Sequence, residues 1–235
     1  MIRLLGELWL VGGQLLTHPW DASSYLIKGD EPTFIDFGST EGYPAIKRSL
    51  GAFGYQPSDI KRVLATHGHW DHLSGVASLR AESDTELWIH EADRAQVECG
   101  DFDMTSAFLY DRPFPPLRVD GTLQHGQIIE VGDVQLHVIH TPGHTAGSVC
   151  FWTEMHGMRL LIAGDTISGG YHPRIGSDLA AWTRSLDRLL ELEFDVMTIG
   201  HYPPRLIFDA RHRVAQLRER FAAYFDPWFV LADAG

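Results

Sequence analysis

Histidine and aspartate side chains gather at short spacing in the middle of this chain. The chain has 13 histidines in 235 residues, and His67, His69, Asp71 and His72 fall within six positions. Imidazole nitrogens and carboxylate oxygens suit Zn, Fe, Mn or Co. In an extended loop alternate side chains point the same way, so all four cannot aim at one ion. We therefore expect His67 and His69 to share one metal, and Asp71 and His72 to turn towards a second.

Four apolar runs end at residues of this kind. The runs are 62–66, 136–140, 160–164 and 196–200, and they lead to His67, His144, Asp165 and His201. Open sheets place functional residues at the carboxyl ends of their strands. Glycine precedes three of these residues, and it permits a tight turn or a close backbone approach there. The pattern predicts that the four strand ends meet, and the two oxygens of Asp165 would allow it to bridge two ions.

The remaining elements form two successive sets of strands followed by helices. Strands are expected at 2–11, 24–28, 33–37, 86–90, 127–131, 134–140, 148–153, 159–163 and 195–199, and helices at 43–53, 73–79, 92–98, 178–192 and 210–225. Such an order indicates an α/β sandwich of sheets flanked by helices. The length suits one core, so we expect a single domain over residues 1–235.

Residues 99–121 lack a clear period and contain several aromatic residues and prolines. Two interpretations remain open for this segment. It is either a surface loop packed by its own aromatic side chains or a lid over the site, because long irregular segments in compact domains are often functional.

In order along the chain, these motifs resemble the metallo-β-lactamase superfamily. The matching stretches are Thr66–Gly75 (THGHWDHLSG), His140–Ser148 (HTPGHTAGS), Gly164–Thr166 and Gly200–His201. The resemblance implies a four-layer αββα sandwich with two mixed sheets. It also implies that His67, His69 and His144 hold a first metal, that Asp71, His72 and His201 hold a second, and that Asp165 bridges. Asp36 would orient a ligand histidine.

The resemblance also narrows the chemistry. Asp165 stands where true β-lactamases have Cys or Ser, and His69 stands where redox di-iron relatives have Glu. We therefore expect a dinuclear hydrolase, in which a bridging hydroxide attacks an ester, thioester or lactone carbonyl. Asp71 and Asp165 are the expected catalytic carboxylates, and Tyr171, His172 and Tyr202 are candidate substrate contacts. Zinc is the expected metal, with iron, manganese or cobalt as alternatives.

Other members of the superfamily supply competing hypotheses. One is a mononuclear iron enzyme similar to persulfide dioxygenases, and others are a phosphodiesterase or a β-lactam hydrolase. Only about one helix follows His201, whereas glyoxalase II has a helical glutathione-binding domain there. In addition, Ser168 stands where lactonases have a substrate-contacting tyrosine. The substrate therefore stays open between these branches.

Charge and composition limit the partners. Asp and Glu outnumber Lys and Arg by 31 to 19, giving a formal net charge of −12, which disfavours nucleic acid. No apolar run is long enough to cross a membrane. The two cysteines suit a reducing cytoplasm. We expect a small-molecule substrate, a cytoplasmic location, and a chain that acts alone or as a homodimer.

Overall fold

The computed structural model describes residues 1–202 and 205–223, and side chains up to residue 220. Its first sheet has seven strands in the order β1-β2-β3-β4-β5-β6-β7. They are β1 (Ile2–Leu5), β2 (Leu8–Gly12), β3 (Ser24–Ile27), β4 (Thr33–Ile35), β5 (Arg62–Leu64), β6 (Glu86–His90) and β7 (Gly121–Leu123). Strands β1 to β4 pair antiparallel and β4 to β7 pair parallel, so this sheet is mixed.

The second sheet has six strands in the order β13-β12-β11-β10-β9-β8. They are β8 (Ile128–Val131), β9 (Val134–His140), β10 (Val149–Met155), β11 (Met158–Ile162), β12 (Val196–Thr198) and β13 (Ile207–Phe208). All neighbours pair antiparallel except β11 and β12, which are parallel. The parallel pair brings the carboxyl ends of β11 and β12 to the same edge.

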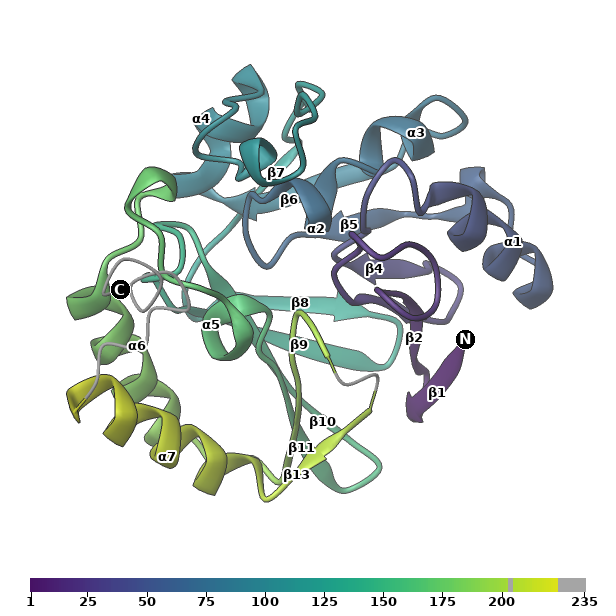
Figure 1. Cartoon of the computed structure of the whole chain (residues 1–235). Coiled ribbons are helices and arrows are strands. Elements are labelled where there is room, and N and C mark those ends of the chain that lie inside the picture. The colour runs from purple at the N-terminus through teal and green to yellow at the C-terminus, as the bar shows by residue number, and fades with distance from the viewer. Residues whose placement is uncertain (203–204, 224–235) are drawn as a thin grey trace.

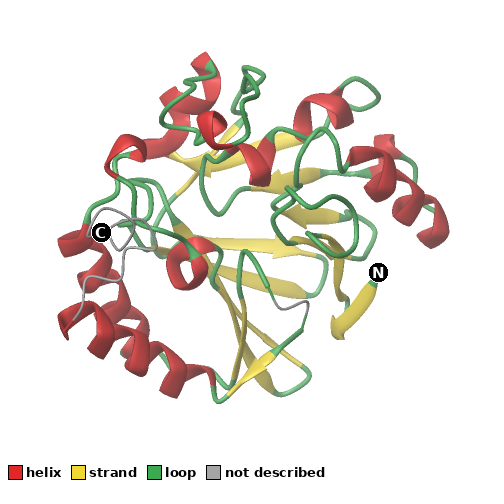
Figure 2. Cartoon of the chain, in the orientation of Figure 1, coloured by secondary structure: helices red, strands yellow, loops and turns green. Residues whose placement is uncertain are grey.

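Helices cover the outer faces of both sheets (Figure 1, Figure 2). On the first sheet these are α1 (Tyr43–Phe53), α3 (Val76–Arg80) and α4 (Glu91–Cys99), and on the second they are α6 (Leu179–Leu190) and α7 (Ala210–Ala223). The short helices α2 (Trp70–Leu73) and α5 (Asp165–Ser168) begin just after strands β5 and β11. Single turns η1 (Pro57–Asp59), η2 (Ala107–Leu109) and η3 (Pro173–Ile175) lie in the connections.

Three apolar cores separate the four layers. One lies between α1, α3, α4 and the first sheet, one between the two sheets, and one between the second sheet and α6 and α7. Strand β10 shows how alternation divides the cores, since Phe151 faces the first sheet while Cys150 faces the helices. The expected αββα sandwich is confirmed.

Most expected elements are present, with shifted ends. The helix expected at 43–53 has the same bounds as α1. The helix expected at 178–192 is α6, and Asp178 caps it by accepting a hydrogen bond from the Ala181 N–H. The apolar run 2–11 is a hairpin rather than one strand, because Gly6 takes a positive φ of 51° and turns the chain. The expected end of the last helix, at residue 225, lies outside the described residues.

Within the described part of the chain, no helix combines the length and apolar character that crossing a membrane requires. Three later residues of the segment 99–121, Phe114, Leu117 and Val119, are buried in the core between the helices and the first sheet. Only η2 interrupts its irregular course before β7.

Candidate metal centre

Strand ends from both sheets deliver the candidate ligands to one edge of the sandwich. His67 follows β5 of the first sheet, while Asp165 and His201 follow β11 and β12 of the second. The last two loops are joined by a hydrogen bond from the Gly200 N–H to the Gly164 carbonyl, at 2.9 Å. A Cβ at residue 200 would lie 1.9 Å from Asp165 Oδ1, so only glycine fits there.

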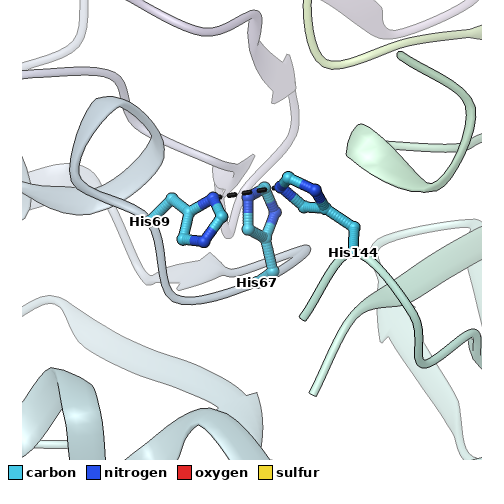
Figure 3. Close-up of side chains that lie close together, drawn as sticks. All are labelled: His67, His69 and His144. Atoms are coloured by element: carbon cyan, nitrogen blue, oxygen red, sulfur yellow. Dashed lines mark hydrogen bonds between the residues drawn. The ribbon is translucent and has the colours of Figure 1, made fainter. Parts of the chain in front are cut away.

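The first ligand group contains His67, His69 and His144 (Figure 3). All three are buried, and one ring nitrogen from each lies within 4.8 Å of the others. His69 Nδ1 is 3.0 Å from His144 Nε2, and the ring centroids of His67 and His69 are 4.4 Å apart. This spacing is that of ligands gathered around one point.

The second group contains Asp71, His72 and His201. His201 Nε2 lies 3.3 Å from Asp71 Oδ2, and His72 Nε2 lies 3.8 Å from the same oxygen. Asp165 lies between the two groups. Its oxygens are 3.5 Å from His144 Nε2, 3.6 Å from His72 Nε2 and 3.3 Å from His201 Nε2. The carboxylate of Asp165 therefore faces ligands of both groups.

Three buried ring nitrogens at this centre lack a hydrogen-bond partner among the described residues. They are the Nε2 atoms of His67, His69 and His72. Buried polar atoms are normally satisfied, so the unsatisfied Nε2 atoms of His67 and His72, whose ring centroids are 4.1 Å apart, fit a bound cation. His69 faces His144 through its other ring nitrogen, Nδ1. Nitrogen and carboxylate oxygen donors in this arrangement fit divalent transition metals.

In two of the candidate ligand histidines, His72 and His144, the Nδ1 atom is held by the protein. His72 Nδ1 lies 2.8 Å from Asp36 Oδ2, which also accepts a hydrogen bond from the Thr66 hydroxyl at 2.7 Å. His144 Nδ1 lies 3.0 Å from the Gly170 carbonyl. Such contacts orient the ring and leave Nε2 free for a metal. The structure thus places Asp36 against a ligand histidine.

The charges of the centre separate its histidines into two kinds. Burial, together with the neighbouring rings, lowers the pKa of His67 and His69 well below the ordinary value, so their lone pairs are available. Burial opposes protonation of His72 too, but Asp36, Asp71 and Asp165 together raise its pKa well above the ordinary value. The pKa of His201 is raised against the effect of burial, chiefly by Asp165.

The three expected substrate contacts differ in their surroundings. Tyr202 is 56% exposed and lines a cavity of about 20 Å³ beside His201. Tyr171 packs against the core between the second sheet and its helices. His172 accepts a hydrogen bond from the Arg174 N–H at 3.1 Å and lies against Phe108, with 5.3 Å between ring centroids. Their role as substrate contacts stays a prediction.

Two further residues at the centre escaped sequence reasoning. The side chain of Tyr110, in the segment 99–121, lies beside Asp71, which contributes to raising its pKa, and its ring stacks on Trp70 with centroids 4.6 Å apart. Asp93, in α4, accepts hydrogen bonds from the loops that carry His69 and His144. Neither belongs to a ligand-like spacing. For Asp93, the sequence showed only an acidic residue within the expected helix 92–98. For Tyr110, it showed only an aromatic residue in an irregular segment.

Comparisons with known proteins agree with this geometry. Residues 18–201 match the model of the metallo-beta-lactamase superfamily. An acyl-coenzyme A thioesterase from Gallus gallus is 30% identical over 73% of this chain and 67% of that protein. A hydroxyacylglutathione hydrolase from Methylobacterium nodulans is 27% identical over 81% of this chain and 56% of that protein. A HARLDQ-motif mutant of a metallo-beta-lactamase from Cronobacter sakazakii superposes with a TM-score of 0.77 at 27% identity, covering 94% of this chain and 95% of that one.

The fold and the two groups of buried nitrogen and oxygen donors, together with these relatives, define a metal-dependent hydrolase. The chain belongs to the metallo-beta-lactamase superfamily.

Proposed function

We propose that this protein is a dinuclear hydrolase of a small thioester, ester or lactone. It cleaves the single bond that joins the carbonyl carbon to sulfur or oxygen. The observation that carries the proposal is the position of Asp165 between two candidate ligand groups, within 3.6 Å of histidines from both. A carboxylate so placed would serve both cations. His67, His69 and His144 would hold the first, and Asp71, His72 and His201 the second.

Divalent cations in this centre, with zinc the expected metal, would supply Lewis acidity and a nucleophilic water at neutral pH. The residues of the chain would then orient the reactants. Asp71 is the carboxylate that would orient the attacking water. A carbon–oxygen bond would form, the bond from the carbonyl carbon to sulfur or oxygen would break, and the leaving group would take up the proton of the water. A thioester or ester would yield an acid and a thiol or alcohol, and a lactone a single hydroxy acid.

Thioesters are the substrate class that the comparisons favour. The relative from Gallus gallus is described as an acyl-coenzyme A thioesterase, and the one from Methylobacterium nodulans as a hydroxyacylglutathione hydrolase. A thiolate is a better leaving group than an alkoxide, so such a reaction asks little of a general acid.

The test combines metal analysis with a substrate panel. The protein is purified without chelator, its metals are counted by elemental analysis, and hydrolysis of thioester, lactone, phosphodiester and β-lactam substrates is measured. Asp165→Ala and His69→Ala should lose most of the thioester hydrolysis and bound metal. His125→Ala, which changes an exposed histidine, should retain both. A metal-free wild type after supplementation, or full activity in both ligand variants, would contradict the proposal.

A further inference from the structure

A completely buried carboxylate lies behind the first ligand group. Asp93, in the first turn of α4, has no exposed surface and is not a ligand in either group. Its Oδ2 accepts hydrogen bonds from the Gly68 N–H at 2.9 Å and the Thr145 hydroxyl at 2.7 Å. Its Oδ1 accepts one from the Gly147 N–H at 2.7 Å. All three donors belong to the metal-ligand motifs.

The charge of Asp93 is not neutralised by a side chain. Among the described residues, no Lys, Arg or His nitrogen pairs with this carboxylate. Burying an unpaired charge is unfavourable unless hydrogen bonds compensate it. The compensation here comes entirely from two loops, so the carboxylate and the loops depend on one another.

The two loops also approach α4 closely at their glycines. A Cβ at residue 147 would lie 2.7 Å from the backbone nitrogen of Asp93, and a Cβ at residue 68 would lie 2.6 Å from Gln96 Nε2, which would have to move. Gly68 stands between His67 and His69, and Thr145 follows His144 directly. The carboxylate therefore bonds groups beside the ligands of the first group and cross-links residues 68 and 145, which are 77 positions apart.

We propose that Asp93 is a positioning residue that sets the separation of the first-group ligands. By bonding the loop of His67 and His69 to the loop of His144, it keeps His69 Nδ1 3.0 Å from His144 Nε2. Ligand groups held in place before a cation arrives bind it more tightly, because less ordering remains to be done. This inference rests on the proposed metal-dependent function. It predicts that loss of the Asp93 carboxylate lowers the metal affinity of the first group and leaves that of the second group unchanged.

The test uses Asp93→Asn, which has nearly the same shape but replaces one acceptor oxygen with a donor. At least one of the three N–H or O–H donors then loses its acceptor. Binding of Zn²⁺ alone is measured by competition with a chromophoric chelator. His144→Ala and His201→Ala, titrated in parallel, identify which binding step belongs to which group. One Zn²⁺-binding step should be absent from His144→Ala. In Asp93→Asn the affinity of that step should fall by about 10- to 100-fold. The step lost in His201→Ala should stay within about threefold of wild type, since that group makes no contact with Asp93.

The matched control is Asp120→Asn. Asp120 also accepts a hydrogen bond from a backbone N–H, that of Leu87 at 3.0 Å, but it lies among Arg80 and Arg118 away from the ligands. The Asp120→Asn variant should have a lower melting temperature but unchanged Zn²⁺ affinity in both binding steps. Unchanged Zn²⁺ binding in Asp93→Asn, or an equal loss in both steps, would overturn the inference. A wild type that binds no Zn²⁺ contradicts the proposed function instead.

A second readout needs no metal. Crystal structures of the metal-free wild type and Asp93→Asn give the distance from His69 Nδ1 to His144 Nε2. An increase in the variant supports the positioning role of Asp93. An unchanged distance, with the loops still in place, overturns it.

Discussion

At the scale of single residues, Tyr110 adds a side chain next to Asp71 that no sequence motif indicated. Tyr110 comes from the irregular segment 99–121, yet its side chain lies beside the carboxylate of Asp71, a candidate ligand. Burial, with Asp71 next in importance, raises its pKa far above the ordinary value, so it stays a hydrogen-bond donor. Its ring is anchored by Trp70, which is itself buried and donates to the Pro113 carbonyl at 3.2 Å.

Tyr110→Phe keeps the stacked ring and removes only the hydroxyl. We expect the rate of hydrolysis to fall by about 10- to 100-fold, because Asp71 loses a neighbouring hydroxyl donor. Steady-state kinetics and metal content check this, with kcat falling more than KM rises. The control is Tyr43→Phe, which removes a tyrosine hydroxyl that donates to Glu82 at 2.8 Å, away from the centre. Equal activity in the two variants would contradict the role of Tyr110.

The raised pKa values of His72 and His201 predict a pH dependence of metal binding. A histidine whose pKa is raised keeps its proton to higher pH, and a cation must displace that proton to bind. Zn²⁺ affinity should therefore fall as the pH is lowered from about 8 to about 6, where histidines take up protons. Chelator competition across this range measures it. Asp36→Asn removes one of the carboxylates that raise the pKa of His72, so the dependence should become shallower. A pH-independent affinity would count against this reasoning.

At the scale of elements, α6 supports the loop that carries His144. The loop carbonyls of Pro142 and Gly143 accept hydrogen bonds from the Ser185 hydroxyl at 2.7 Å and the Asp178 N–H at 2.8 Å. Gly143 has a φ of 150°, and a Cβ there would lie 2.4 Å from the Cα of Trp182. The helix and the loop can approach so closely only because residue 143 lacks a side chain.

Gly143→Ala tests this approach. The added methyl must push α6 and the loop apart, so we expect a loss of about 1–3 kcal/mol in the free energy of unfolding. Binding of metal by the first group should weaken at the same time. Denaturant unfolding and Zn²⁺ titration measure the two effects.

Gly126→Ala separates the clash from backbone strain, since Gly126 also has a positive φ, 81°, but nothing within 4 Å of a Cβ. If both variants lose the same stability and neither loses metal, close packing by α6 is not what positions His144.

At the scale of the whole molecule, the centre joins the two sheets. The first sheet and α2 supply His67, His69, Asp71 and His72, while the loops of the second sheet supply His144, Asp165 and His201. Ligand nitrogens and oxygens from opposite layers therefore lie within a few ångströms of one another. Bound cations would cross-link the two sheets, which otherwise pack against each other through the apolar core between them.

Removal of metal should accordingly destabilise the whole fold. A ligand that binds only the native state at about 100 times its Kd adds about 2.7 kcal/mol of stability. We expect the melting temperature of the metal-replete protein to fall on treatment with a chelator and to recover when Zn²⁺ is restored. His69→Ala should show a smaller difference between the two states. Identical melting curves for replete and chelated wild type would mean that the cations contribute nothing to holding the layers.

Sequence patterns were informative where function is encoded over short distances. Strand periodicity, followed by a histidine or aspartate at the strand end, predicted both the sandwich and the residues that the structure gathers at its edge. His67 and His69, two positions apart, fall in one group because alternate side chains of an extended loop point the same way. Asp36, which directly follows β4, was predicted through the family resemblance.

The partners of those residues were decided only by the tertiary structure. Asp93 resembles any acidic residue in the first turn of a helix, and Tyr110 lies in a segment without periodicity. Their roles depend on which loops pack against α4 and on how residues 99–121 cross Trp70. The sequence by itself determined the kind of chemistry, because donor types and strand ends are local properties. The surroundings that orient the donors arise from contacts between segments distant in the chain, and those contacts exist only after the layers have packed.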